Sequence, residues 1–162
     1  MKESPSLVGL IGFLLGLWVA MTILTAALPA RSEELHPLFE AVNEIRAEHH
    51  LRLLVPRTDL ARIAQAHAED MARRDYLSHI NPEGLNPLTR AQAAGLEGFR
   101  LLAENIGLTS VRADPHSAVV EEWLQSHEHH ENLVHPAFNA TGLGVAETPD
   151  GRTIYVQLYA AY

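Results

Sequence analysis

The 162-residue sequence contains no cysteine, which excludes disulfide bonds, thiolate metal sites and a cysteine nucleophile. It also lacks an excess of positive charge. With its histidines neutral the net charge is −8, so no basic stripe is available to meet the phosphates of a nucleic acid. No internal repeat is present. The charge disfavours a nucleic-acid partner. The length is enough for one domain with a proper core plus an extra segment.

Two catalytic signatures are also missing. The sequence has no Gly-x-Ser-x-Gly elbow to expose a nucleophilic serine and no His-Glu-x-x-His helix to bind a catalytic zinc ion. Ser78 or Ser126 beside a histidine and an acid would still make a serine-hydrolase arrangement. We expect Ser126 inside a helix, however, where a serine hydroxyl more often bonds back to a carbonyl.

What the sequence does have is an ordinary balance of residues and many histidines. Apolar residues make up 47% and charged residues 20%, as in globular domains. Ten histidines are many for this length. Because their protonation near pH 6 would cancel much of the negative charge, a pH sensor is one hypothesis for the function.

The N-terminal part carries an uncharged apolar run at residues 7–28. A run of this length spans the hydrocarbon core of a bilayer, about 30 Å, at about 1.5 Å per residue. The alternative is a cleaved signal peptide, whose apolar core is shorter. We favour a single-pass anchor. In both interpretations the domain is exported. We therefore expect residues 1–34 to be an anchor or signal segment plus linker, and residues 35–162 to be the extracytoplasmic domain.

Helical patterns dominate the rest of the chain. Apolar residues recur at helical spacing on one face of each pattern, and the expected helices cover residues 35–50, 58–75, 87–94 and 114–130. Pro37, Pro87 and Pro115 each fall in a first turn, where proline costs no backbone hydrogen bond.

Extended patterns lie between and after these helices. Residues 51–56 form a short connector, and 101–106 an extended segment that ends near a turn at Gly107. Residues 142–147 and 153–159 alternate as strands around a Pro-Asp-Gly turn. The fold class is therefore α+β. We expect an α-β-α sandwich with a small, mainly antiparallel sheet between helices, preceded by one transmembrane helix.

Polar residues gather in three islands between these apolar segments. The islands are Ser78–Gly84, Ala103–Ile106 and Ser126–Leu133. They contain His79, Glu104 and a run of histidines. Because binding and catalytic residues concentrate on loops held by a rigid scaffold, we expect the islands to form one site.

Several other polar or aromatic residues have simpler interpretations. His67 lies on an apolar helix face, so we expect a core histidine bonded to a backbone carbonyl. Trp123 is expected in the core. Arg90 is expected to bond nearby carbonyls or a carboxylate. His127 and His130 are expected to be solvated residues at the C-terminal end of their helix.

Taken together, the motifs resemble those of the CAP superfamily, also called SCP domains, in its short bacterial branch. The resemblance covers nearly all of residues 35–162. It rests on the ordered set Asn43-Glu44-Ile45-Arg46, Ala103-Glu104-Asn105-Ile106, Trp123-x-x-Ser126-x-x-His129-x-x-Asn132-Leu133 and Gly142-x-Gly144-Val145.

The resemblance implies a cleft lined by two histidines and two acids. His79 matches the first histidine, Glu104 the first acid and His129 the second histidine. Ser126 stands where many relatives have the second acid, so this chain lacks one charge of the set. The family's known activities include sterol and lipid binding and extracellular signalling.

Three roles for these residues remain open at this point. His79, His129 and Glu104 would make a zinc site with an open fourth position. They would equally make a purely structural hydrogen-bond network. We expect a binding or interaction module for a lipid, peptide or cell-wall ligand rather than an enzyme. The alternative is a metal-dependent hydrolase that acts on peptide or cell-wall material, with Glu104 as the candidate catalytic residue.

Overall fold

Four strands form one sheet in the order β1-β3-β4-β2. The computed structural model describes residues 35–162. The strands are β1 (Val55–Pro56), β2 (Leu101–Thr109), β3 (Ala140–Glu147) and β4 (Thr153–Ala161). β1 pairs with β3 in parallel, while β3 with β4 and β2 with β4 are antiparallel. The sheet is therefore mainly antiparallel, as predicted.

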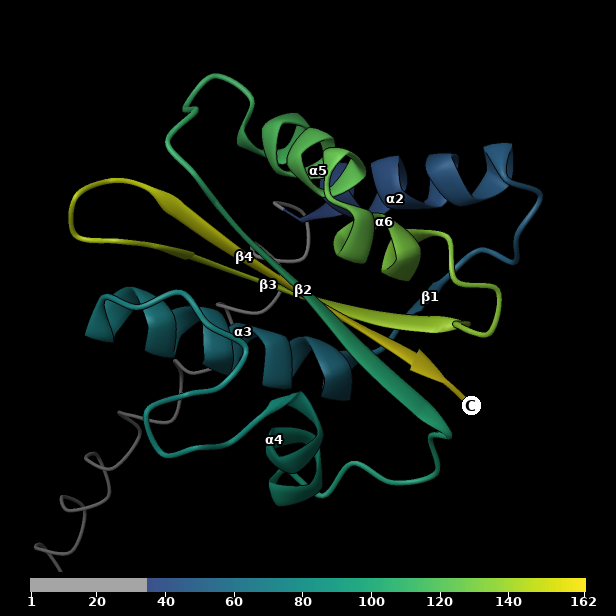
Figure 1. Cartoon of the computed structure of the whole chain (residues 1–162), viewed down its shortest axis with the longest axis horizontal. Helices are drawn as coiled ribbons and strands as arrows, with labels where there is room; N and C mark the ends of the chain where they lie inside the picture. Colours follow the sequence, from purple (N-terminus) through teal and green to yellow (C-terminus); the bar gives the residue numbers. More distant parts are fainter. Residues whose placement is uncertain (1–34) are drawn as a thin grey trace, which may run out of the picture.

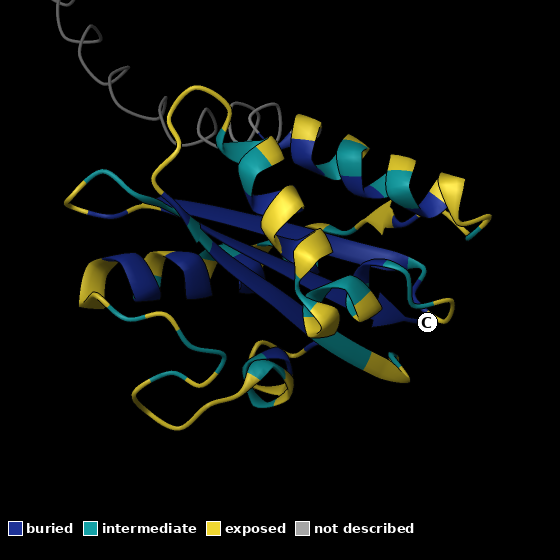
Figure 2. Cartoon of the chain, turned by 45° about the horizontal axis from the view of Figure 1, so that its top comes forward, coloured by how far each residue is buried: buried dark blue, intermediate teal, exposed yellow. Residues whose placement is uncertain are grey.

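Helices cover both faces of this sheet (Figure 1). On one face lie α3 (Thr58–Arg74) and α4 (Pro87–Ala93). On the other lie α2 (His36–Glu48), α5 (Pro115–Gln125) and α6 (His127–Leu133). Two separate clusters of buried apolar side chains, one for each face, fill the space between the layers. Figure 2 shows most of β3 and β4 coloured as buried between the helices. The predicted α+β architecture with the sheet between helices is confirmed.

Local capping explains where two of the helices begin. The side-chain oxygen of Asn86 accepts from the backbone N–H of Thr89 at 2.9 Å, and Pro87 follows it. Asp114 accepts in the same way from Ser117 at 3.1 Å, again just before a proline. In both helices, the side chain before the first turn accepts from a backbone N–H that has no partner within the helix. Asparagine and aspartate are both favoured at this N-cap position.

Close backbone contact joins α3 to the middle of the sheet. A Cβ atom on Gly142 would lie 2.2 Å from the backbone nitrogen of Ala61, and one on Gly144 would lie 2.4 Å from the carbonyl carbon of Ala64. Only glycine fits at such distances. The helix therefore packs directly on β3. This contact fixes the distance of α3, and of the start of the loop that follows it, from the sheet.

A buried arginine joins α2 to the chain after α6. Arg46 is fully buried and donates to the carbonyl oxygens of Leu133 at 2.7 Å, Phe138 at 2.9 Å and Arg52 at 3.0 Å. Burial lowers the pKa of its guanidinium. These carbonyls would otherwise be unsatisfied, so Arg46 fixes a segment that has no regular secondary structure.

Two expectations about local structure are wrong. β2 does not turn at Gly107 but continues to Thr109. The glycine is needed there because Val119 and Trp123 occupy the space of a side chain. The single helix expected over residues 114–130 is two helices. Ser126 has extended backbone angles, φ −93° and ψ 123°, and separates α5 from α6 instead of lying inside a helix.

The expected membrane segment, residues 7–28, lies outside the described residues. Within residues 35–162, no helix combines the length and the apolar character needed to cross a bilayer.

Candidate functional site

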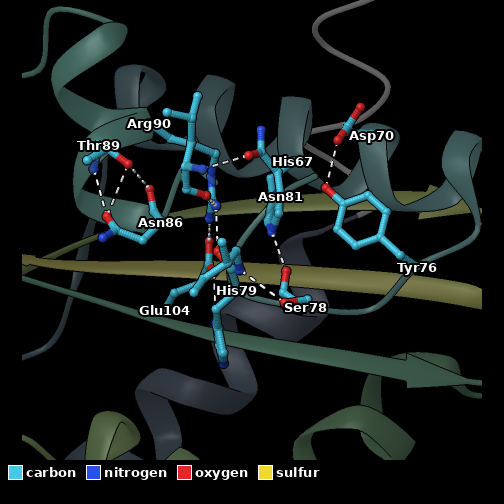
Figure 3. A network of polar contacts seen from close by, with 12 residues as sticks. His67, Asp70, Tyr76, Ser78, His79, Asn81, Asn86, Thr89, Arg90 and Glu104 are labelled. Atoms are coloured by element: carbon cyan, nitrogen blue, oxygen red, sulfur yellow. Dashed lines mark hydrogen bonds and ion pairs between the residues drawn. The ribbon is translucent and has the colours of Figure 1, made fainter. Parts of the chain in front are cut away.

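Glu104 is the centre of a polar cluster on the α3 and α4 side of β2 (Figure 3). Its Oε1 lies 2.9 Å from Nδ1 of His79, which belongs to the loop between α3 and α4. Its Oε2 accepts from Nη2 of Arg90, on α4, at 2.5 Å. The two carboxylate oxygens therefore hold one residue each, and three separate segments meet at one side chain.

Arg90 also fixes the loop that carries His79. Its Nη1 donates to the backbone carbonyl of His79 at 2.6 Å and to that of Leu85 at 3.0 Å. The expectation that Arg90 bonds carbonyls and a nearby carboxylate is confirmed. One guanidinium thus sets the backbone position of the histidine and the orientation of the acid that bonds its ring.

The cluster is buried at the acid and open at the histidine. The side chain of Glu104 is 1% exposed and that of Arg90 is 10% exposed, whereas 45% of the His79 side chain is exposed. A carboxylate buried this deeply requires its cationic and hydrogen-bonding partners. Because Nδ1 of His79 faces Glu104, the free Nε2 edge of the ring is the one available to a ligand.

A second set of contacts holds the start of the same loop on α3. Nε2 of His67 lies 2.9 Å from the carbonyl oxygen of Ser78. The hydroxyl of Tyr76 donates to Asp70 at 2.6 Å. Burial lowers the pKa of His67, so this ring is neutral at pH 7 and donates from Nε2. The prediction of a core histidine bonded to a carbonyl is confirmed.

His129 lies on the opposite side of β2, on α6. The amide of Asn105 donates to the carbonyl oxygen of His129 at 3.0 Å, and the amide of Asn132 donates to Asn105 at 2.8 Å. The same Asn105 nitrogen lies 3.2 Å from the hydroxyl of Tyr159. A buried polar network inside the sheet therefore positions the helix that carries His129.

The electrostatic surroundings of His129 favour its neutral form. Burial lowers its pKa, and the positive charge of a protonated His79 lowers it further. Its Nδ1 is buried without a hydrogen-bond partner among residues 35–162. The two imidazoles are thus within electrostatic range of each other, across the edge of the sheet.

The structure places the predicted site residues on two sides of β2. His79 and Glu104 are in direct contact on one side. His129 lies on the other side. The hydroxyl of Ser126 makes no hydrogen bond within residues 35–162, and Ser78 accepts one only from the N–H of Ile80, at 3.1 Å. Neither serine hydroxyl bonds to a histidine, so the described residues do not form a serine-hydrolase arrangement.

The predicted metal ligands have a different relationship from the one expected. Within residues 35–162, no group of three or more histidine, aspartate or glutamate side chains is arranged to hold a metal ion. Glu104 lies behind His79, with both oxygens in hydrogen bonds. It stands where an acid orients an imidazole ligand rather than where it would bind the metal itself.

The flanking histidines also depart from expectation. His127 lies in the first turn of α6 and pairs weakly with Glu131 at 3.5 Å, so it is not at a helix C-terminus. His130 is in the last turn, as expected, and its ring touches that of His49. Trp123 is fully buried and donates to the carbonyl of Ile106 at 3.0 Å, which confirms its place in the core.

Sequence reasoning missed Asn105 and Asn132 as positioning residues. Both stood inside the motifs, directly after Glu104 and three residues after His129. Their role depends on a contact between β2 and α6, which no local pattern reveals.

A separate hollow lies beside the cluster around Glu104. A groove of about 850 Å³ runs between α3 and α4 and is lined by residues of both signs of charge, including Arg62 and Glu97. His67, Asp70 and Arg90 line part of this groove, whereas His79 and Glu104 do not.

Comparison with known proteins gives a consistent picture. Residues 39–159 match the model of the CAP, or cysteine-rich secretory protein, family. A membrane protein of Bacillus subtilis, YlbC, is described as uncharacterized and is 30% identical over 108 residues. That alignment covers 67% of this chain and 30% of YlbC. The chain therefore spans less than a third of the length of that relative.

Solved structures support the same fold. An extracellular SCP-domain protein from Bacillus anthracis is 28% identical, with a TM-score of 0.69 over 88% of this chain and 45% of that one. An outer surface protein from Borrelia burgdorferi has a TM-score of 0.71 over 80% of this chain and 92% of that one. At 23% identity, the second shows the fold alone.

Proposed function

The chain belongs to the CAP family of cysteine-rich secretory proteins, and from this premise we propose that it is an exported, membrane-anchored binding module. Its binding site consists of His79 and His129, supported by Glu104 and Arg90. The ligand is a divalent metal ion or a small group that bonds to imidazole nitrogen. Recognition, rather than turnover, is the function that this arrangement supports best.

The observation that carries the proposal is the way in which His79 is held. Its Nδ1 is bound by a buried carboxylate, its backbone carbonyl is bound by Arg90, and 45% of its side chain remains exposed. A ring fixed on one edge and open on the other is preorganised for a ligand, because little side-chain freedom is lost on binding.

Zinc fits the donor chemistry of the two histidines. Metal binds to the neutral imidazole, and the lowered pKa of His129 keeps that ring neutral at physiological pH. Glu104 accepts from the Nδ1 side of His79, which fixes the tautomer that offers Nε2 to a metal. Zinc bound there would supply a Lewis acid that attracts an anionic or carbonyl ligand.

The sequence and the relatives support export and anchoring. The apolar run at residues 7–28 is long enough for one membrane span. One relative is described as a membrane protein and one structural relative as extracellular. We therefore place residues 35–162 on the extracytoplasmic side, attached through the N-terminal segment.

The hydrolase alternative draws less support from the geometry. A general base needs a carboxylate free to accept a proton from water or substrate. Both oxygens of Glu104 are engaged, one by Arg90 and one by His79, and its side chain is buried. Glu104 is better placed to orient His79 than to take part in a reaction.

Zinc titration of the full chain in detergent tests the proposal. We expect saturable binding that weakens at least about tenfold in His79→Ala and in His129→Ala, since each removes a donor. His127→Ala is the matched control, because it removes an exposed histidine from the same helix as His129. Absence of zinc binding, or equal loss in all three variants, would overturn the proposed site.

A further inference from the structure

The end of α2 and the helix α6 bring two further histidine rings together, away from the cluster around Glu104. His49 stands at the C-terminal cap of α2, and His130 lies in the last turn of α6. Their ring centroids are 6.0 Å apart, and the ring planes are inclined at 70°. Both helices cover the same face of the sheet (Figure 1). Two side chains that can bind a metal ion are thus neighbours in space, although they are far apart in the chain.

The spacing of these two rings fits a shared metal ion. Imidazole nitrogen binds zinc at about 2.0–2.1 Å, so two rings on one ion have their centroids roughly 5–6.5 Å apart. The distance between His49 and His130 falls within this range. Zinc does not dictate the angle between the ring planes, because its filled d shell gives it no geometric preference. At most, the exposed side chain of His49 must rotate for both rings to direct a nitrogen at one point.

The nitrogens of both rings are available to a ligand. Within residues 35–162 neither side chain takes part in a hydrogen bond or an ion pair, and the contact between the rings is the interaction that they make. His49 is exposed and His130 is half-buried. His67 and His79 differ, because a carbonyl or a carboxylate occupies one nitrogen of each. Neutral imidazole with an unoccupied nitrogen is a common metal ligand.

The backbone that carries the pair is already held in place. His49 closes the last turn of α2, where its N–H donates to the carbonyl of Ile45 at 3.2 Å. Arg46, one turn earlier, joins α2 to the end of α6, because it donates to the carbonyl of Leu133 at 2.7 Å. His130 lies within that same helix. Two ligands on segments that are joined in this way lose little freedom when they bind an ion.

The charges of the two helices favour a cation. α6 contains two glutamates and no lysine or arginine. α2 contains three glutamates and one arginine, and that arginine, Arg46, is fully buried. The exposed charge of both helices is therefore negative. Such a field raises the local concentration of a divalent cation at the two rings.

We propose that His49 and His130 form a second metal site, which binds one divalent transition-metal ion of the class of zinc, copper and nickel. Imidazole nitrogen suits these ions, whereas calcium and magnesium require oxygen. Within residues 35–162 no group of three histidine, aspartate or glutamate side chains is arranged to hold a metal, so solvent supplies the remaining ligands. The site is separate from His129, because consecutive residues of a helix point about 100° apart.

An ion at this site would join α2 to α6. Because α6 also carries His129, the ion would fix the helix that supports the proposed binding site. An ion that binds only the folded chain also raises its stability.

Zinc titration of the full chain in detergent tests the second site in the His79→Ala variant, which lacks one ligand of the first site. We expect one zinc ion to bind this variant. The further change His49→Phe or His130→Phe should weaken that binding at least about tenfold, since each removes a donor. Phenylalanine keeps the contact between the rings and removes the nitrogens. His127→Phe is the matched control, because His127 is exposed on the same helix as His130 and should not alter the binding.

Three results would overturn the second site. They are no zinc binding by His79→Ala, unchanged binding after His49→Phe, and equal weakening by His127→Phe, which would mean adventitious binding to surface histidines. Thermal unfolding of the metal-free variants shows that each is folded.

Thermal unfolding with zinc gives a second readout. Zinc should raise the Tm of His79→Ala, a chelator should reverse the rise, and His49→Phe should abolish it, because the ion no longer joins two helices. The amides of α6 should exchange more slowly when zinc is bound. An equal rise in Tm in His49→Phe would refute the link between α2 and α6.

The two metal sites can fail separately in the parent chain. Zinc binding that is weakened by His79→Ala but not by His49→Phe retains the proposed function and removes the second site. The reverse pattern retains the second site and removes the first.

Discussion

Glu104 and Asn105 are neighbours on β2, and each holds one of the two histidines. The carboxylate of Glu104 binds the ring of His79, at 2.9 Å, on one face of the strand. The amide of Asn105 binds the backbone carbonyl of His129, at 3.0 Å, on the other face. Because consecutive side chains of a strand point to opposite faces, two adjacent residues can support a site on both sides of one sheet edge.

Loss of Arg90 should lower the stability of the fold, because it leaves the buried carboxylate of Glu104 without its cationic partner. We expect Arg90→Met to lower the free energy of unfolding by about 3–5 kcal/mol. The double variant Arg90→Met with Glu104→Gln should lose less than the sum of the single losses, since the unpaired charge is gone. Urea unfolding measures all three. Arg73→Met, which breaks an exposed ion pair, is the control. If the losses of Arg90→Met and Glu104→Gln add exactly in the double variant, the two side chains do not form a coupled buried pair.

Loss of Asn105 should loosen α6. Asn105→Ala removes the amide that joins His129, Asn132 and Tyr159, and we expect a loss of about 2–3 kcal/mol in the free energy of unfolding. Amides of α6 should exchange faster, and zinc should bind less tightly. Exposed Gln125→Ala should change none of these. An α6 that exchanges normally in Asn105→Ala would disprove the positioning role.

Acidification should destabilise the fold through His67. Burial holds its pKa below the ordinary 6.5, so below pH 6.5 the unfolded chain binds more protons than the folded one. The free energy of unfolding should therefore fall as the pH drops from 7 towards 5. His67→Gln, which retains a donor for the carbonyl of Ser78, should show a smaller fall over the same range. A wild-type stability that is flat between pH 7 and 5 would exclude this dependence.

The contact between α3 and β3 should not tolerate a methyl group. A Cβ on Gly142 meets the backbone of Leu60 and Ala61 at 2.2–2.3 Å, and backbone cannot move aside. We expect Gly142→Ala to lower stability by about 1–3 kcal/mol or more. Gly107→Ala should cost less, because it meets the side chains of Val119 and Trp123. Thermal unfolding compares the two, and the reverse order would show that α3 shifts easily.

Much of the fold follows from local patterns. The apolar spacing and the prolines at 37, 87 and 115 correctly located the starts of α2, α4 and α5. The alternation after residue 140 predicted the terminal strands. The sequence can predict these features because capping, helical periodicity and strand alternation depend on residues that are close together in the chain.

The errors arose where distant segments decide the outcome. Gly107 looked like a turn, but it is the point where Val119 and Trp123 press against β2. Ser126 looked helical, but the chain breaks there, and α6 reaches β2 through Asn132. In both places a contact from another element overrides the local preference, and the sequence window around the residue does not contain that element.

The sequence alone determined the family resemblance, the exclusion of cysteine chemistry and the choice of His79, Glu104 and His129. Only the tertiary structure decided their relationship. It placed Glu104 behind His79 on one face of β2, and Asn105 under the helix of His129 on the other face. The reason is physical. Residue types define which bonds are available, but strand order and register decide which groups are satisfied internally and which remain for a ligand.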